Sequence, residues 1–144
     1  MSSCAIASLL RVALLASLLA FFETAIAGSI GSGPYADNCV LYLRHVRHVK
    51  LPQKDLTTWG AKRSIINSEK AKKGRVAIIE IPSGKYKQYG HVALVVDVDD
   101  DGKKKSITIE EANYPSPGYW RRKVEGSKMS DLEKKLNIRG YYKP

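Results

Sequence analysis

Apolar side chains recur at a helical spacing in the segment that begins at Cys39. Positions three and four residues apart are apolar as far as Val49, which is the spacing of one helix face. Asp37 is suited to cap the N-terminus of such a helix, and Pro52 ends the segment. We therefore predict a helix over about residues 38–49. Cys39 lies in its first turn, in line with the stripe that faces the core.

The pattern changes from a helical to an extended period beyond Gly74. Several segments there are rich in Val and Ile and are separated by turn residues, which is typical of strands. We predict strands over residues 75–81, 91–98, 105–111, 119–124 and 137–142, and a short helix over residues 130–136. The stretch from Leu51 to Lys73 is mixed and is expected to hold short helix and loop. One helix followed by about five antiparallel strands predicts an α+β domain.

Residues 1–27 have the pattern of a secretory signal peptide. Arg11 precedes an apolar run over residues 12–22, and the segment ends in Ala-Ile-Ala at Ala27. The run is about half the ~20 residues that a membrane-spanning helix needs, so a retained anchor is the weaker alternative. We expect cleavage after Ala27 and a secreted or periplasmic bacterial protein without stable membrane insertion.

The predicted cleavage leaves a chain whose size is typical of one domain. Residues 28–34 are rich in Gly and Ser and are predicted to form a flexible lead-in to one domain over residues 35–144. The formal net charge of +10 is expected to attract polyanions. Lys and Arg are scattered and match no nucleic-acid-binding motif, so an anionic cell wall or membrane surface is favoured over nucleic acid as a partner. The domain is expected to act as a monomer.

A single cysteine remains after the predicted cleavage. Cys4 belongs to the signal peptide, so Cys39 has no partner for a disulfide within its chain. Exported domains that rely on disulfides have an even number of cysteines. Cys39 is therefore a small buried hydrophobe, half of an intermolecular bridge, or a functional thiol. The positions of His91 and Glu111 favour the third alternative.

His91 and Glu111 belong to neighbouring predicted strands. Side chains alternate along a strand, so Glu111 and Asn113 share one face while Glu110 points the opposite way. A three-residue hairpin loop over residues 100–102 would set His91 opposite Glu111, and a loop two residues longer would set it opposite Asn113. A two-residue loop would break this parity. Either of the first two registers places a hydrogen-bond acceptor beside the imidazole.

These residue types together predict a hydrolase that cleaves amide bonds. A cysteine in the first turn of a helix lies at the positive end of the helix dipole, and a nearby imidazolium lowers its pKa further from about 8.5. The Cys39 thiolate would attack an amide carbonyl, the peptide N–H of Cys39 would help to hold the oxyanion, and His91 would protonate the leaving amine. Glu111 would fix the tautomer of the imidazole and stabilise its charged form.

Four short motifs follow one another along the chain: Asn38-Cys39, Gly90-His91-Val92-Ala93, Glu111-Ala112-Asn113 and Ile138-Arg139-Gly140-Tyr141-Tyr142. In this order they resemble the CHAP domain, the family of cysteine, histidine-dependent amidohydrolases and peptidases, which is related to the NlpC/P60 and papain-like folds. The resemblance implies a papain-like fold in which a helix carrying Cys39 packs on an antiparallel sheet. It also implies Cys39 as nucleophile, His91 as base, Glu111 as the residue that orients the base, and Asn113 as a further polar member of the site.

The resemblance also implies a substrate. Family members mostly cleave bacterial peptidoglycan, as N-acetylmuramoyl-L-alanine amidases or as endopeptidases, and a few cleave glutathionylspermidine. The sequence departs from the family at Leu41, where an aromatic residue is usual, and at Gly74-Arg75-Val76, where Gly-Asp-Val is usual. These departures and the positive charge motivate a second hypothesis, a catalytically silent, cationic wall-binding protein on the same scaffold. A third is an amidase that acts on a small glutathione-type amide.

Other candidate ligands and aromatic residues have simpler interpretations. His45 and His48 lie among arginines and are predicted to be exposed to solvent, and no His or Cys is spaced as a zinc ligand. Neither a metal nor a cofactor is expected. Asn113 either belongs to the site or merely ends its strand. Tyr114, Tyr119 and Trp120 either line a groove for a sugar or peptide or belong to the core.

Overall fold

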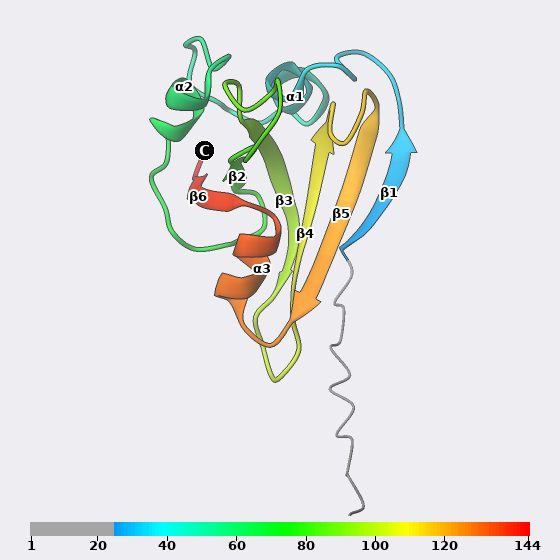
Figure 1. Ribbon diagram of the computed structural model, residues 1–144, viewed down its shortest axis with the longest axis vertical. Coiled ribbons are helices and arrows are strands. Elements are labelled where there is room, and N and C mark those ends of the chain that lie inside the picture. The colour runs from blue at the N-terminus through cyan, green and yellow to red at the C-terminus, as the bar shows by residue number, and fades with distance from the viewer. Residues whose placement is uncertain (1–24) are drawn as a thin grey trace, which may run out of the picture.

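The computed structural model describes residues 25–144, whose strands form one antiparallel sheet (Figure 1). In chain order the elements are β1 (Ile26–Gly31), α1 (Cys39–Leu41), the π-helical turn η1 (Tyr42–Val46), α2 (Trp59–Arg63), β2 (Val76–Ile79), β3 (His91–Asp99), β4 (Lys105–Ala112), β5 (Tyr119–Gly126), α3 (Met129–Lys135) and β6 (Ile138–Tyr142). The strand order across the sheet is β1-β5-β4-β3-β2-β6. The α+β class predicted from the sequence is confirmed, and the sheet has six strands rather than about five.

Strand β1 occupies a segment for which the sequence predicts a flexible lead-in. Its backbone pairs with β5, from Ile26 beside Lys123 to Gly31 beside Tyr119, and all of its side chains are exposed. The pairing needs only backbone groups, because the edge of β5 offers N–H and C=O groups that require partners. A segment rich in Gly and Ser can therefore form a strand without contributing to the core. The predicted cleavage site after Ala27 lies inside β1, and residues 1–24 lie outside the described part of the chain.

The helical segment that begins at Cys39 is shorter than the sequence predicts. Three residues of α1 run directly into η1, and the left-handed backbone of His48, with φ of 53°, follows the end of η1. A left-handed residue is a common way to end a helix, so the prediction that the helix continues to residue 49 is wrong at its C-terminal end. The residue that caps the N-terminus is Asn38 rather than Asp37.

Different helical segments cover the two faces of the sheet. The buried side chains of Tyr42 and Leu43 from η1 pack in one core with Val92 of β3. The buried side chain of Leu132 from α3 packs in the other core with Ala93 of β3. Successive residues of β3 therefore face different cores, as alternation along a strand requires. Burial of one such leucine side chain contributes about 1.5–3 kcal/mol, so both layers hold β3 and β4 in place.

The β3–β4 hairpin has a longer loop than predicted and a compensating irregularity. Asp99 pairs with Ser106, so six residues, not three, connect the pair, and this register alone would turn His91 and Glu111 to opposite faces. A β-bulge between Val95 and Asp97 shifts the pairing by one residue, so that Leu94 pairs with Glu110. Continued toward the strand start, the shifted register sets His91 opposite residue 113. The shared face of His91 and Glu111 is thus restored, in the second of the two registers that the sequence allows.

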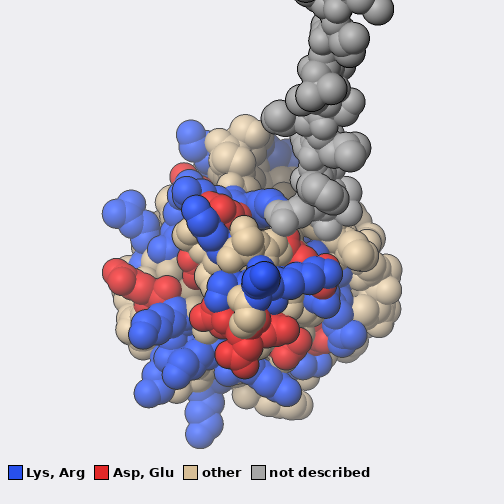
Figure 2. Space-filling model, turned by 90° about the horizontal axis from the view of Figure 1, so that it is seen from below, with Lys and Arg blue, Asp and Glu red and all other residues tan. Residues whose placement is uncertain are grey.

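Charged side chains of both signs cover the end of the molecule that carries this hairpin. Figure 2 shows acidic side chains gathered near the middle of the view, with Lys and Arg around them. The excess of Lys and Arg over Asp and Glu, 24 against 14, is therefore not a single basic patch on this face. Over residues 25–144, no helix has the length and apolar character that crossing a bilayer requires.

Candidate active site

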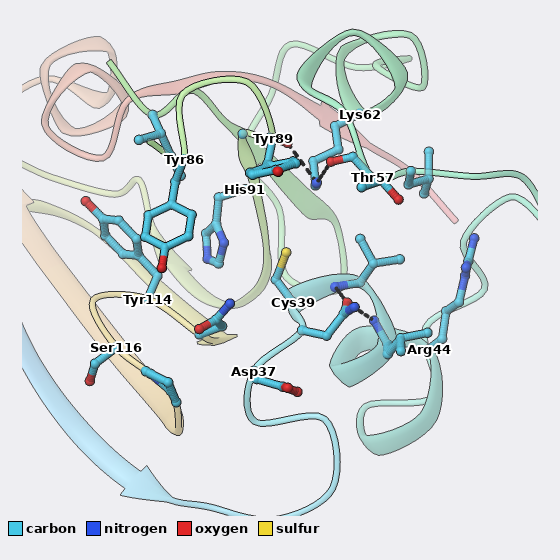
Figure 3. Close-up of a pocket in the computed structure, with 18 of the residues that line it drawn as sticks. Asp37, Cys39, Arg44, Thr57, Lys62, Tyr86, Tyr89, His91, Tyr114 and Ser116 are labelled. Atoms are coloured by element: carbon cyan, nitrogen blue, oxygen red, sulfur yellow. Dashed lines mark hydrogen bonds between the residues drawn. The ribbon is translucent and has the colours of Figure 1, made fainter. Parts of the chain in front are cut away.

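Cys39 is the first residue of α1, and the side chain of Asn38 holds this helix start. The Oδ1 atom of Asn38 accepts hydrogen bonds from the backbone N–H groups of Val40 (3.1 Å) and Leu41 (3.0 Å). These are donors that a helix start cannot satisfy internally. Cys39 forms no disulfide and is partly exposed. Its sulfur projects into a pocket on the side where the ring of His91 lies (Figure 3).

His91 is the first residue of β3, and a glycine before it allows the chain to turn into the strand. Gly90 has φ of 58°, in the left-handed region that favours glycine, and a Cβ atom there would lie 2.5 Å from the ring of Trp59. His91 is only 3% exposed. Its Nε2 atom lies 2.7 Å from Oε2 of Glu111, which leaves Nδ1 as the ring nitrogen for the thiol.

The carboxylate of Glu111 is fully buried and binds two cationic groups. Besides His91, it pairs with Arg122 of β5, which donates from Nε to Oε1 and from Nη2 to Oε2, the latter at 3.0 Å. Burial acts to raise the pKa of Glu111, but His91 and Arg122 lower it overall. The ring of Tyr114 lies against both the imidazole, at 5.3 Å between ring centroids, and the guanidinium, at 4.8 Å. This closed circle of contacts fixes the orientation of the imidazole.

Cys39 and His91 each change the pKa of the other. Burial acts to raise the pKa of the Cys39 thiol, but the charge and hydrogen bonding of His91, with smaller effects of Lys62 and the backbone N–H of Val92, lower it to about 7. Burial acts to lower the pKa of His91, but Cys39 and then Glu111 raise it to about 9. Between about pH 7 and about pH 9 the two groups are therefore a thiolate and an imidazolium.

Asn113 lies beside these three residues. It directly follows β4, lines the same pocket as Cys39 and His91, and has φ of 63°. Its backbone N–H donates to the carbonyl oxygen of Gly118 at 3.1 Å, so it also closes the turn after the strand. Both interpretations that the sequence allows, a polar residue of the site and a turn residue, are compatible with this position.

The pocket in front of the sulfur has a volume of about 620 Å³. Its walls come from the start of α1, the segment 55–57, the loop before β3 and the loop after β4. Tyr86 and Tyr89, which are 53% and 40% exposed, contribute to the loop before β3, and Tyr114 belongs to the loop after β4 (Figure 3). An open pocket with aromatic walls and a few polar groups suits a peptide or sugar chain that contains an amide.

The remaining aromatic and histidine residues lie away from the pocket. Tyr119 packs against the ring of Tyr42 at 4.7 Å between centroids, and the indole N–H of Trp120 donates to the backbone oxygen of residue 116 at 2.9 Å. His45 and His48 are exposed, as the sequence predicts. Among residues 25–144, no group of three or more His, Cys, Asp or Glu side chains is arranged to hold a metal ion.

Two charged residues of the site, Arg122 and Lys62, are not predicted from the sequence. Arg122 shares a face with Glu111 because β5 pairs with β4 so that Glu111 lies opposite Trp120. Alternation along the predicted strand 119–124 places Arg122 on the face of Glu111 only when the register between β4 and β5 is known. Lys62 belongs to the mixed stretch between residues 51 and 73, where no sequence pattern indicates its burial or its place in the pocket wall.

Comparison with known proteins agrees with this geometry. The model of the CHAP domain matches residues 29–113, a segment that contains Cys39, His91, Glu111 and Asn113. Searches of curated proteins and of solved structures found no match. CHAP domains are typically cysteine- and histidine-dependent amidohydrolases. Because the match covers more than half of the chain and includes the paired thiol and imidazole, the chain belongs to the CHAP domain family.

Proposed function

We propose that the protein is an exported cysteine hydrolase that cleaves amide bonds of bacterial peptidoglycan, as an amidase or an endopeptidase. The observation that carries the proposal is that Cys39 and His91 line one open pocket, while the carboxylate of Glu111 lies buried behind the imidazole at 2.7 Å. The family supports the reaction class, since CHAP domains act on peptidoglycan. The net charge of +10 supports attraction to an anionic wall, which should weaken as salt is added.

In this mechanism the Cys39 thiolate attacks the carbonyl carbon of the scissile amide. The peptide N–H of Cys39 donates to the oxyanion, and the Nδ1–H of His91 gives its proton to the nitrogen of the departing amine as the C–N bond breaks. A thioester to Cys39 remains. Water then attacks this thioester, His91 takes the proton of the water, and the Cys39 thiolate leaves. Glu111 accepts a hydrogen bond from Nε2–H throughout and so stabilises the imidazolium.

The test compares digestion of purified peptidoglycan by the mature protein with that by Cys39→Ala. We expect the variant to lose activity by at least about 10³-fold, because no thiolate remains to form the acyl-enzyme. Mass spectrometry of the products identifies the bond by its newly freed amino group. Circular dichroism and thermal unfolding show whether the variant is folded. Equal activity in a folded Cys39→Ala protein would exclude covalent catalysis by this residue.

Export is a separate part of the proposal and has its own test. Cleavage after Ala27 would remove Ile26 and Ala27, whose side chains are exposed, and would leave Gly28 inside β1 as the new N-terminus. We expect mass spectrometry of protein recovered from the medium or periplasm to show a chain that begins at Gly28. A full-length chain found only inside the cell would contradict export.

A catalytically silent wall-binding protein is the second candidate, and the departure at Leu41 together with the net charge favours it. Alkylation distinguishes the two candidates. A thiol with a pKa of about 7 has far more thiolate at pH 6 than a free thiol, so folded protein should react quickly with iodoacetamide. Slow labelling of folded protein would favour the silent scaffold. Rapid labelling without release of muropeptides would instead favour the third candidate, an amidase on a small glutathione-type amide.

A further inference from the structure

Lys62 of α2 is a buried lysine in the wall of the pocket that contains Cys39. It is 3% exposed, and its Nζ atom donates to the backbone oxygens of Thr57 (3.0 Å) and Tyr89 (2.8 Å). An ammonium group has three donors, and these two carbonyls occupy two of them. Figure 3 shows the ammonium between Thr57 and Tyr89, on the side of the pocket where the sulfur of Cys39 lies. The side chain thus presents a charged group to the place where a substrate would bind.

The ammonium of Lys62 forms no direct ion pair within the described chain. Burial lowers its pKa, and the charges of Cys39 and Asp55, which act from farther away, offset this only in part. Between residues 25 and 144, no Asp or Glu oxygen lies within 4.0 Å of its Nζ atom. Asp55 lines the same pocket, but its Oδ1 atom accepts the backbone N–H of Thr57 at 2.8 Å. Arg44, which also lines the pocket, adds a second cation. Removing a charge from water is unfavourable unless an opposite charge compensates it, so this wall suits an anionic group.

We propose that the ammonium of Lys62 binds a carboxylate of the substrate close to the scissile amide, so that the enzyme selects peptide stems that carry a free carboxylate. The inference rests on the proposed function and specifies its substrate class. Lys62 and Cys39 line the same pocket, with the ammonium on the side where the sulfur lies (Figure 3), which places the bound carboxylate near the bond under attack. Peptidoglycan stems offer such a group where a D-glutamate is linked through its side chain and keeps its α-carboxylate free.

The test uses two muropeptides that differ in one group. The first is N-acetylmuramoyl-L-Ala-γ-D-Glu-L-Lys-D-Ala, and the second carries an amide in place of the D-glutamate α-carboxylate. We expect the mature wild-type protein to cleave the acidic form with a kcat/KM about tenfold or more above that of the amidated form, because the amide cannot pair with the ammonium. A third probe is amidated only at the terminal D-alanine. It shows whether the enzyme recognises the terminal carboxylate instead of the D-glutamate α-carboxylate.

Lys62→Gln removes the charge but keeps N–H donors for the two carbonyls, and the exposed Lys103→Gln on the β3–β4 hairpin is the matched control. We expect Lys62→Gln to cleave acidic and amidated probes equally and Lys103→Gln to keep the wild-type preference. If Lys62→Gln does not fold, Lys62→Arg is compared with the wild-type protein instead. Because arginine keeps the positive charge, Lys62→Arg should retain the preference for the acidic probe. Thermal unfolding establishes which variants are folded.

Each contrary result has a distinct meaning. Equal cleavage of all three probes by the wild-type protein would overturn the inference and leave the proposed function intact. An equal loss on all probes in Lys62→Gln, with slower alkylation of Cys39 by iodoacetamide, would also overturn it and assign Lys62 to activation of the thiol. Failure of the wild-type protein to cleave any probe or purified peptidoglycan would refute the proposed function, and the inference with it.

Discussion

Glu110 and Glu111 are neighbours in β4, and both carboxylates are buried, but they point to opposite faces of the sheet. Glu111 lies behind the pocket and pairs with Arg122 of β5. Glu110 lies on the other face and accepts a hydrogen bond from Nε of Arg121, at 3.0 Å. Each carboxylate takes one arginine from β5, because the two arginines alternate along their strand as the two glutamates do. Each of the two neighbouring glutamates is therefore bound to β5 through one arginine.

The second partner of each carboxylate differs and decides what the carboxylate can do. Glu111 binds His91, which can gain and lose a proton in the pocket. Glu110 lies 2.9 Å from Nη1 of Arg47, which follows η1 and is always charged. Glu110 can only fasten the end of the helical segment that begins at Cys39 to the sheet, whereas Glu111 acts on a group that reacts. Identical side chains in adjacent positions thus have different roles because of the faces on which they lie.

The largest expected effect that separates the two glutamates is on catalysis. Glu111→Gln should lower kcat by about 10³-fold, since the amide does not stabilise the imidazolium or enforce its tautomer. Glu110→Gln should lower kcat by less than about fivefold, because it touches no reacting group. Muropeptide release by the two proteins, each shown to be folded by circular dichroism, provides the comparison. Similar losses of kcat in both variants would mean that the carboxylate on the pocket side has no special role.

The arginines from β5 should differ in their contributions to stability. Arg122→Ala leaves Glu111 buried with only His91 to compensate it, and breaking a buried ion pair in this way costs about 3–5 kcal/mol of the free energy of unfolding. The side chain of Arg121 is 55% exposed, so solvent screens its pair with Glu110, and Arg121→Ala should change stability by less than about 1 kcal/mol. Urea unfolding at about pH 7.5 measures the change in the free energy of unfolding for both variants. Equal destabilisation would contradict the distinction between a buried and a screened pair.

Much of this arrangement can be predicted from the sequence. The prediction fails where a contact depends on how strands that are distant in the sequence pair with one another. Alternation alone places Glu111 on the face of Asn113 and Glu110 on the other, and the structure agrees. The predicted hairpin loop is wrong, yet His91 still reaches Glu111, because the bulge between Val95 and Asp97 corrects the parity that the longer loop breaks. A bulge depends on packing across the sheet rather than on a local motif, so the pattern of single residues does not reveal it.

Other features lie beyond sequence patterns for related reasons. β1 forms through backbone pairing with the edge of β5, so its side chains carry no periodic signal. Arg122 becomes a partner of Glu111 only through the register of β5, and Lys62 of α2 is held by backbone oxygens of Thr57 and Tyr89, which belong to loops. The nucleophile and base are predictable because a helix start and a strand start each have a local signature. Their charged neighbours are not, because contacts between distant segments determine them.

The pH dependence of activity should also distinguish the two glutamates, with a smaller effect than those on kcat and on stability. The rate requires a thiolate and an imidazolium, so kcat/KM should rise through an apparent pKa of about 7 and fall through one of about 9, with its maximum between them. Glu111 helps to raise the pKa of His91. The residual activity of Glu111→Gln should therefore begin to fall at a lower pH than that of the wild-type protein, on the alkaline side of its maximum. Glu110→Gln should keep the wild-type profile. An unchanged alkaline limb in Glu111→Gln would show that the carboxylate does not stabilise the imidazolium.

A further small effect is expected for the link between Glu110 and the helical segment. The side chain of Arg47 is 37% exposed, so Arg47→Ala should reduce the free energy of unfolding by only about 1 kcal/mol. It should leave the rate of Cys39 alkylation at pH 6 unchanged, because Asn38 and the packing of Tyr42, rather than Arg47, hold the helix start. Unfolding in urea and the alkylation rate can be measured on the same sample. A slower alkylation without loss of stability would show that the ion pair between Arg47 and Glu110 positions the nucleophile. Glu110 would then also act on the reacting groups, as Glu111 does.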